Sequence, residues 1–147
     1  MTDHRALASG YFNAAWDLID LDPRTAEQDR DMIGIALASR QHWIEAGGTP
    51  THLATSDWQV AHAASLAGFG ELAMTFALAA VERAESNPVP DWLVASAHEG
   101  LARAYASVGD VAGYEREAAT TRELLEKVSD PDNRDLVAGQ LASIPVP

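Results

Sequence analysis

The chain has 147 residues, of which 47% are hydrophobic and 22% are charged, and 22 acidic against 10 basic side chains give it a formal net charge of -12. This acid excess, with no basic cluster, excludes the phosphate-neutralising surface that nucleic-acid binding requires, and it disfavours binding to anionic membranes. The absence of cysteine excludes thiolate nucleophiles, disulfides and cysteine-ligated metals. No segment resembles a signal peptide or reaches transmembrane length, so we expect a single cytoplasmic domain over residues 1–147.

Helix-forming residues dominate the chain, and glycine and proline gather at a few points between long segments. Runs of Val, Ile and Thr that would indicate strands are absent, which predicts an all-α fold. The breaks separate seven expected helices, at about 3–21, 25–46, 50–67, 71–85, 91–108, 111–128 and 131–144. Helices of this length joined by short turns must be antiparallel neighbours.

Local signals mark where several of these helices begin. Thr25 and Gln28 form a Thr-x-x-Gln capping box at the start of the second helix. Asp130 followed by Pro131 places an N-cap and a first-turn proline before the seventh helix. We expect this last, short helix to cover the preceding hairpin as a cap.

Two glycine turns, at Gly68 and Gly109, lie 41 positions apart and indicate a repeated helical hairpin. The segment LARAYASVGD, which ends at Asp110, resembles the end of the first helix and the Gly-Asp turn of a tetratricopeptide repeat. The resemblance covers about 91–127, and 58–85 is a looser copy with Phe69 where Asp is expected. It implies a right-handed superhelix of stacked hairpins, with a concave groove that binds a peptide or protein. In this superfamily the repeat pattern reflects packing and does not identify a ligand.

No G-x-S-x-G, P-loop, G-x-G-x-x-G or H-E-x-x-H motif is present, so the candidate site residues are polar or aromatic side chains on or beside apolar helix stripes. In the second helix, Arg40 shares a stripe with Trp43, and His42 lies on the adjoining one. Arg40 could hold a carboxylate or phosphate, with Trp43 as a flat wall and His42 as a proton donor or acceptor. The alternative is that Arg40 pairs with a carboxylate across a helix interface and Trp43 belongs to the core.

The third and fifth helices carry the other candidates. Trp58 and His62 stand four residues apart and could line a pocket, or could be a packing anchor with a histidine beside it. Glu99 and Arg103 are also four apart, and His98 adjoins them. Burial would raise the pKa of Glu99 towards the range of a general base unless Arg103 holds it ionised. The alternative is an exposed Glu99–Arg103 ion pair, with His98 as a core histidine bonded to a backbone carbonyl.

Two hypotheses follow for the function. The first is a non-enzymatic binding module that engages a peptide, a protein partner or a second copy of itself through a concave groove and needs no cofactor. The second is a protein that binds a small anionic ligand, or a small enzyme, in a pocket between the second, third and fifth helices. That pocket would be lined by Arg40, His42, Trp43, Trp58, His62, His98, Glu99 and Arg103.

A metal site and a homodimer are two further considerations. A weaker alternative is a metal site with the ligands His42, His62, His98 and Glu99. No two of these histidines stand four residues apart on one helix, so we expect no metal. The first helix is apolar over a wider arc than one neighbouring helix covers, which predicts a homodimer through this end. The arc consists of Phe12, Ala15, Trp16, Leu18, Ile19 and Leu21.

Overall fold

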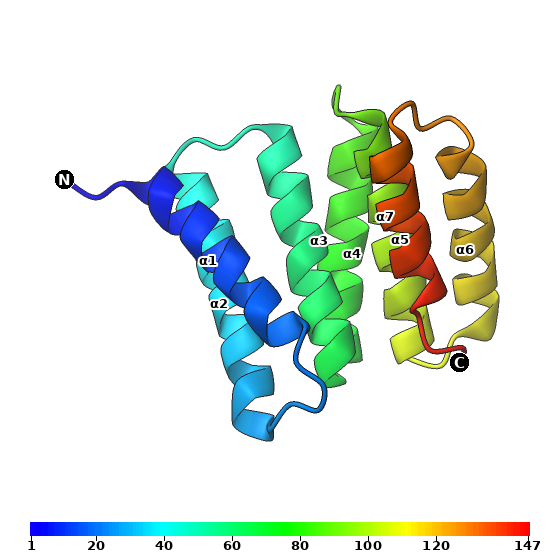
Figure 1. Ribbon diagram of the computed structural model, residues 1–147, viewed down its shortest axis with the longest axis horizontal. Helices are drawn as coiled ribbons and strands as arrows, with labels where there is room; N and C mark the ends of the chain where they lie inside the picture. Colours follow the sequence, from blue (N-terminus) through cyan, green and yellow to red (C-terminus); the bar gives the residue numbers. More distant parts are fainter.

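The computed structural model describes residues 1–147 and consists of seven helices with no strand (Figure 1). The helices are α1 (His4–Ile19), α2 (Ala26–Glu45), α3 (Pro50–Ala67), α4 (Gly70–Glu85), α5 (Asp91–Ser107), α6 (Val111–Leu125) and α7 (Pro131–Ala142). The predicted all-α class is confirmed. None of the seven helices is both long and apolar enough to cross a membrane.

The predicted helix starts are formed by the hydrogen bonds that their sequences indicate. At the start of α2, the backbone N–H of Gln28 donates to the Thr25 hydroxyl at 3.1 Å, and the Gln28 side chain accepts from the Thr25 N–H at 2.8 Å. At the start of α7, the Asp130 carboxylate accepts backbone N–H groups of the first turn. Gly68 and Gly109 adopt φ angles of 84° and 76°, a left-handed conformation that a residue without a side chain adopts most easily.

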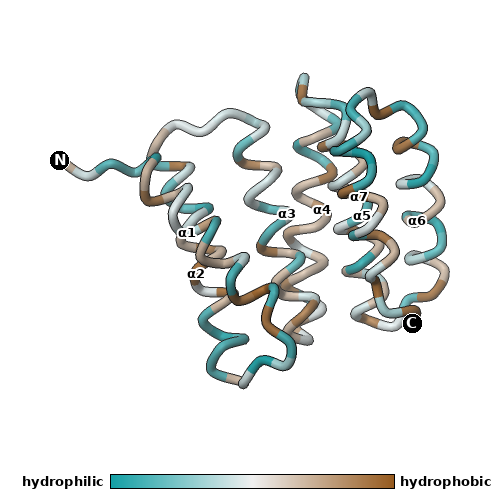
Figure 2. The backbone as a smooth tube through the Cα atoms, viewed as in Figure 1, coloured by the Kyte–Doolittle hydropathy of each residue, from teal (hydrophilic) through white to brown (hydrophobic).

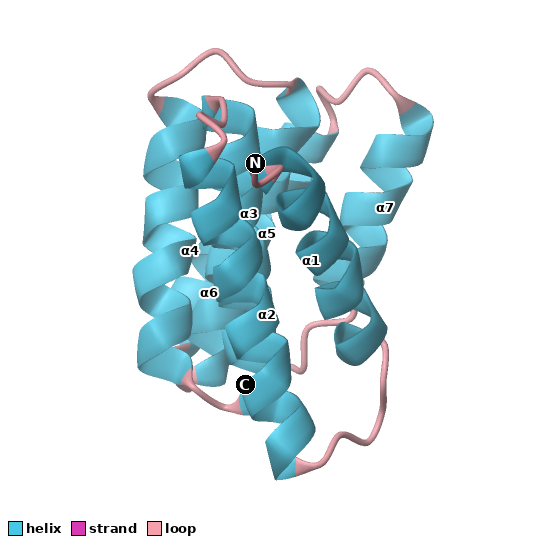
Figure 3. Ribbon diagram, turned by 90° about the vertical axis from the view of Figure 1, so that its left-hand side faces the viewer, coloured by secondary structure: helices cyan, strands magenta, loops and turns pink.

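Consecutive helices pair as hairpins, α1 with α2, α3 with α4, and α5 with α6. Helices α1, α3, α5 and α7 are successive neighbours and form one side of the molecule, while α2, α4 and α6 lie on the other (Figure 3). Helix α7 packs on α5 and α6 through the buried side chains of Val137 and Leu141, in the position of a cap. We call the side formed by α1, α3, α5 and α7 the inner side.

Alanine fills much of the space between the helices. The central cluster joins α3, α4 and α5, and it consists of Ala61, Ala64, Ala73, Ala77, Leu101 and Ala104. Because alanine side chains are small, the helix backbones approach closely at this cluster. The helices differ in hydropathy (Figure 2): α4 is largely pale to brown, whereas α6, which packs against α5 and the cap, carries more hydrophilic segments.

Candidate functional site

Four of the eight predicted site residues come together in the interior, between α3 and α5. Trp58 and His62 of α3 and Glu99 and Arg103 of α5 are all buried, with at most 6% of each residue exposed. The ring centroids of Trp58 and His62 are 4.9 Å apart, and Nε of Arg103 lies 3.5 Å from Oε2 of Glu99. We call these four residues the buried polar cluster. The predicted alternative of an exposed Glu99–Arg103 pair is therefore wrong, because the inner side of α5 is covered by neighbouring helices.

Burial shifts two ionisable groups of the cluster in opposite directions. It raises the pKa of the Glu99 carboxyl from 4.5 to about 7, because the nearby Arg103 guanidinium and the Trp58 indole N–H offset only part of the lost hydration. Burial also lowers the pKa of the His62 imidazole from 6.5 to about 3, assisted by the positive charges of Arg103 and Arg24. At neutral pH, His62 is therefore uncharged and Glu99 is close to its midpoint.

Arg103 joins this cluster to the last helix. Its Nη2 donates to the backbone carbonyl of Gln140 and to the hydroxyl of Ser143, both at 2.8 Å. Ser143 is the C-cap of α7, so the guanidinium lies at the helix end where unpaired carbonyl oxygens concentrate partial negative charge. Arg103 therefore holds the carboxyl-terminal end of α7 against α5.

Arg40 lies apart from the cluster and is paired across a helix interface. Its Nε donates to Oδ1 of Asp57 at 2.6 Å, while Nε of Arg83 donates to Oδ2 of Asp57 at 3.3 Å. The Asp57 side chain is fully buried, and the Arg40 guanidinium also lies over the ring of Phe76. The structure thus contains the carboxylate partner that the alternative interpretation of Arg40 required, and this pair joins α2 to α3.

His42 and Trp43 lie at the α1–α2 end of the molecule. The His42 ring stacks on those of His4 and Tyr11, with centroid distances of 5.2 and 5.7 Å. Trp43 is buried and stacks on His52, with ring centroids 4.0 Å apart and planes inclined by 7°. Both predicted residues therefore hold helices together and do not reach the buried polar cluster.

His98 occupies another place, where it joins three helices. Its Nε2 lies 2.6 Å from Oε1 of Glu85 in α4, and its Nδ1 lies 2.6 Å from Oε2 of Glu117 in α6. The partners are carboxylates and not the backbone carbonyl of the predicted alternative. Because His42, His98 and the buried polar cluster lie in three different places, the four residues of the metal alternative do not share a site.

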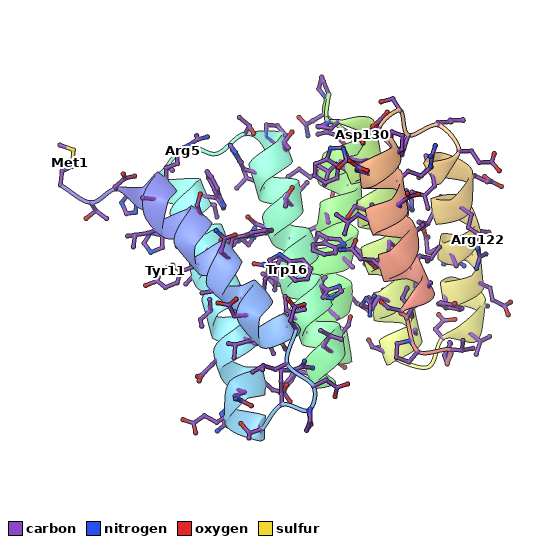
Figure 4. The ribbon with its side chains drawn as sticks, viewed as in Figure 1. Met1, Arg5, Tyr11, Trp16, Arg122 and Asp130 are labelled. Carbon is purple, nitrogen blue, oxygen red and sulfur yellow. The ribbon has the colours of Figure 1, made fainter.

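A cleft of about 630 Å³ opens on the inner side, between α1, α3, α5 and α7. Four aromatic side chains line it, Phe12, Trp16, Trp58 and Trp92, together with Leu93, Leu136 and Val137. Trp16 points from α1 towards the middle of the molecule (Figure 4), and its ring centroid lies 5.8 Å from that of Trp58. We call this hollow the aromatic cleft. Its one charged lining residue is Asp20.

Trp58 belongs to both the aromatic cleft and the buried polar cluster. Its ring lies on the backbone of α5 at Gly100, where an added Cβ would come within 2.8 Å of the indole Cδ1. The missing side chain at Gly100 therefore allows the indole to lie flat against α5. The Trp58 ring in turn separates the cleft from the Glu99 carboxylate, which is not among the residues that line the cleft.

A second hollow of about 220 Å³ lies beside the aromatic cleft, between α1, α2 and α3. The two share Phe12 and Thr55 as lining residues, and the second one reaches the stacked rings of Trp43 and His52. Burial and the neighbouring Arg5 charge lower the pKa of His52 below its ordinary value of 6.5, which favours the uncharged imidazole. We call this the side hollow, and we refer to the two adjoining hollows together as the groove.

Four residues that line the cleft were not among the predicted site residues: Phe12, Trp16, Trp92 and Asp20. Phe12 and Trp16 belonged to the wide apolar arc of the first helix, which was attributed to a dimer contact. A common signal was nevertheless available, because three of the four tryptophans of the chain occur on the first, third and fifth helices, which the hairpin arrangement places on one side.

No family model matches this chain, and no curated protein and no solved structure matches it either. What the groove binds is therefore inferred from its own residues.

Proposed function

We propose that this protein is a binding module of tetratricopeptide-like construction that holds an extended segment of a partner protein in the groove on its inner side. The observation that carries the proposal is the aromatic cleft of about 630 Å³, which four aromatic side chains line and which shares Phe12 and Thr55 with the side hollow. Concave, mostly apolar surfaces with a few polar groups are where proteins bind ligands and partners.

The shape of the groove favours a peptide over a compact small molecule. The aromatic cleft alone lies within the roughly 300–1,000 Å³ range of small-molecule pockets. The side hollow extends it along α1 and adds polar groups, among them Ser9, Asn13 and Ser56. An extended peptide suits a groove with one apolar and one polar part, because its apolar side chains can occupy the aromatic cleft while its polar atoms reach the side hollow.

The aromatic residues of the cleft are suited to bind without large rearrangement. Trp58 is 5% exposed and fixed against Gly100, and Trp16 is packed against Trp58. Rings that are held before binding lose little conformational entropy when a partner arrives. Buried aromatic anchors of this kind contribute a large part of the affinity of protein interfaces.

The experiment selects binding peptides from a displayed library of random dodecapeptides and measures their affinity by fluorescence anisotropy. Leu136 lines the cleft and is 61% exposed, so Leu136→Ser leaves the fold intact. Leu78, which is 49% exposed on α4, gives the matched control Leu78→Ser. Leu136→Ser loses part of one apolar contact and should bind the peptides about tenfold more weakly than the wild-type protein, whereas Leu78→Ser should bind them with wild-type affinity. Failure to select any peptide, or equal binding by both variants, would contradict the proposal.

A second candidate function is a small enzyme or a small-molecule binding protein that uses Glu99. A carboxyl whose pKa is raised to about 7 can accept or donate a proton near neutral pH. Access would require the Trp58 ring to move from its place between Glu99 and the cleft. A thermal-shift screen of small molecules tests this function. If the function is correct, at least one compound raises the melting temperature of the wild-type protein and does not raise that of Glu99→Gln.

The groove favours a neutral or cationic occupant over the anion of the second sequence hypothesis. Arg40 is paired with Asp57, and the Arg103 guanidinium is held by Glu99, Gln140 and Ser143. No basic side chain lines the aromatic cleft.

A further inference from the structure

We propose that the partner segment presents a cationic side chain, arginine or lysine, to the aromatic cleft, where its charge pairs with Asp20 and its stem packs on the tryptophan rings. This inference rests on the proposed function and names the chemistry that the cleft selects. It is carried by three features of the cleft: its aromatic lining, its single charged residue, and the place of that residue on α1.

The lining is of a kind that attracts cations. Phe12, Trp16, Trp58 and Trp92 come from three helices, so rings face the cleft from more than one direction. The Trp16 and Trp58 ring planes are inclined by 33°, which gives the cleft two differently oriented walls. The negative face of an aromatic ring attracts an ammonium or guanidinium group, and tryptophan does so most strongly. The aliphatic stem of arginine or lysine gains apolar contacts with the same walls.

The charge of the cleft is negative. Asp20 is its one charged lining residue, and the formal net charge of the whole chain is -12. A carboxylate or phosphate group entering the cleft would be repelled by both. A neutral apolar side chain would fit the rings but would bring no counter-charge to Asp20.

Asp20 is solvent-exposed at the end of α1, so its carboxylate is accessible to a cation of the partner. Asp20 is the C-cap of α1, where the carbonyl groups of the helix end concentrate partial negative charge. The nearby Arg24 pairs instead with Asp29 at 2.8 Å. Arg24 also donates from Nη1 to the carbonyls of Ile19 and Leu21, so it caps the helix end without pairing with the Asp20 carboxylate. The exposed Asp20 carboxylate therefore has no ion-pair partner within the chain and is free to pair with a cation of the partner.

The test uses bead-bound libraries of hexapeptides with one fixed position and five random ones. The fixed residue is arginine, citrulline or glutamate, and citrulline keeps the shape of arginine without its charge. Fluorescently labelled full-length protein is incubated with each library. We expect about fivefold more protein bound to the arginine library than to the citrulline library, least to the glutamate library, and a smaller preference at high salt.

Two variants with the same change in net charge separate the cleft from the overall field of the protein. Asp20→Asn removes the carboxylate in the cleft, whereas Asp17→Asn removes an exposed carboxylate of α1 that does not line it. The preference for arginine over citrulline should fall to within about twofold in Asp20→Asn and persist in Asp17→Asn. Persistence in both variants would overturn the inference, because the attraction would then come from the net charge alone.

The remaining outcomes distinguish this inference from the proposed function. If the arginine and citrulline libraries bind equally and Leu136→Ser weakens both, the groove binds peptides but does not select a cation, and the inference is wrong. If none of the libraries binds, the proposed function and the inference are both wrong.

Discussion

Glu99 links the protonation of a single side chain to the stability of the whole fold. Its pKa is raised in the folded protein to about 7 from an ordinary value of 4.5, so the folded state binds the proton more tightly than the unfolded chain. The resulting contribution to stability is fully present below pH 4.5 and is lost as the pH rises through 7. The buried carboxyl therefore makes the protein less stable at mildly alkaline pH.

We predict that the Glu99→Gln variant lacks this loss. Between pH 5 and pH 8, the Glu99 contribution to the free energy of unfolding should fall by roughly 2–3 kcal/mol in the wild-type protein. Urea denaturation at the two pH values measures it. Glu115→Gln, a change at an exposed glutamate of α6, serves as the control and should retain the wild-type pH dependence. Equal pH dependence in Glu99→Gln and wild type would contradict the raised pKa.

His62 should act in the opposite direction. Its pKa is lowered in the folded protein from 6.5 to about 3, so its contribution to stability is present above pH 6.5 and is lost as the pH falls towards 3. We predict that His62→Gln loses less stability than wild type between pH 7 and pH 4, by roughly 3 kcal/mol. Thermal or urea unfolding at both values measures the difference, and a loss as large as that of wild type would contradict the prediction.

The residues that the sequence could not place are those whose partners lie on distant helices. Arg40 could be identified as an unusual charge on an apolar stripe, but its pairing with Asp57 depends on how α2 packs against α3. The spacing of Glu99 and Arg103 predicted their proximity, whereas their burial depends on the helices around α5. Local spacing therefore located the residues, and only tertiary packing decided their environment.

At the scale of the helices, prediction from sequence succeeded wherever the cause is local. The Thr25–Gln28 capping box and the glycine turns at Gly68 and Gly109 involve residues within one turn of chain, and all are present in the structure. The stacking of hairpins into a right-handed superhelix involves contacts between helices far apart in sequence, and it stays a prediction. The tryptophans on alternate helices indicated the side on which the aromatic cleft lies, but its full lining could not be predicted, because its walls come from four helices.

Helix α7 should depend on Arg103 more than on any surface charge. We predict that Arg103→Lys, which keeps the charge but loses the planar fork, speeds hydrogen exchange of the α7 amides by about tenfold, because the bonds to Gln140 and Ser143 are weakened. Amides of α4 should exchange at the wild-type rate. Arg116→Lys, on the exposed face of α6, is the matched control. Equal acceleration in every helix would indicate general destabilisation and would contradict the local role.

The close contact between Trp58 and α5 predicts how substitution of Gly100 changes the stability of the protein. An alanine at Gly100 would place its Cβ within 2.8 Å of the Trp58 ring, so we expect Gly100→Ala to destabilise the protein by about 1–3 kcal/mol. Gly139 lies within α7 with nothing near its added Cβ, so Gly139→Ala should instead stabilise by up to about 1 kcal/mol. Chemical denaturation compares the two, and effects of the same sign would show that the Trp58 ring has room to move.

At the scale of the whole molecule, the apolar arc of α1 still predicts a homodimer. Ala15 and Ile19 are buried within the chain, and Phe12 and Trp16 line the cleft. Leu21 remains 39% exposed at this end. We expect light scattering at tens of micromolar protein to give the mass of two chains. A mass of 15.7 kDa, that of one chain, would show that the cleft and the interior account for the arc without a second copy.

The walls of the aromatic cleft include two helices that lie far apart in the sequence, α1 and α7. During synthesis, α1 leaves the ribosome before α7, and the cleft is complete only after Gln140 has emerged. A nascent chain that has folded its first two hairpins would therefore expose the rings of Trp16 and Trp58 without yet forming the site. A chain truncated before α7 would therefore lack the cleft wall that Leu136, Val137 and Gln140 provide.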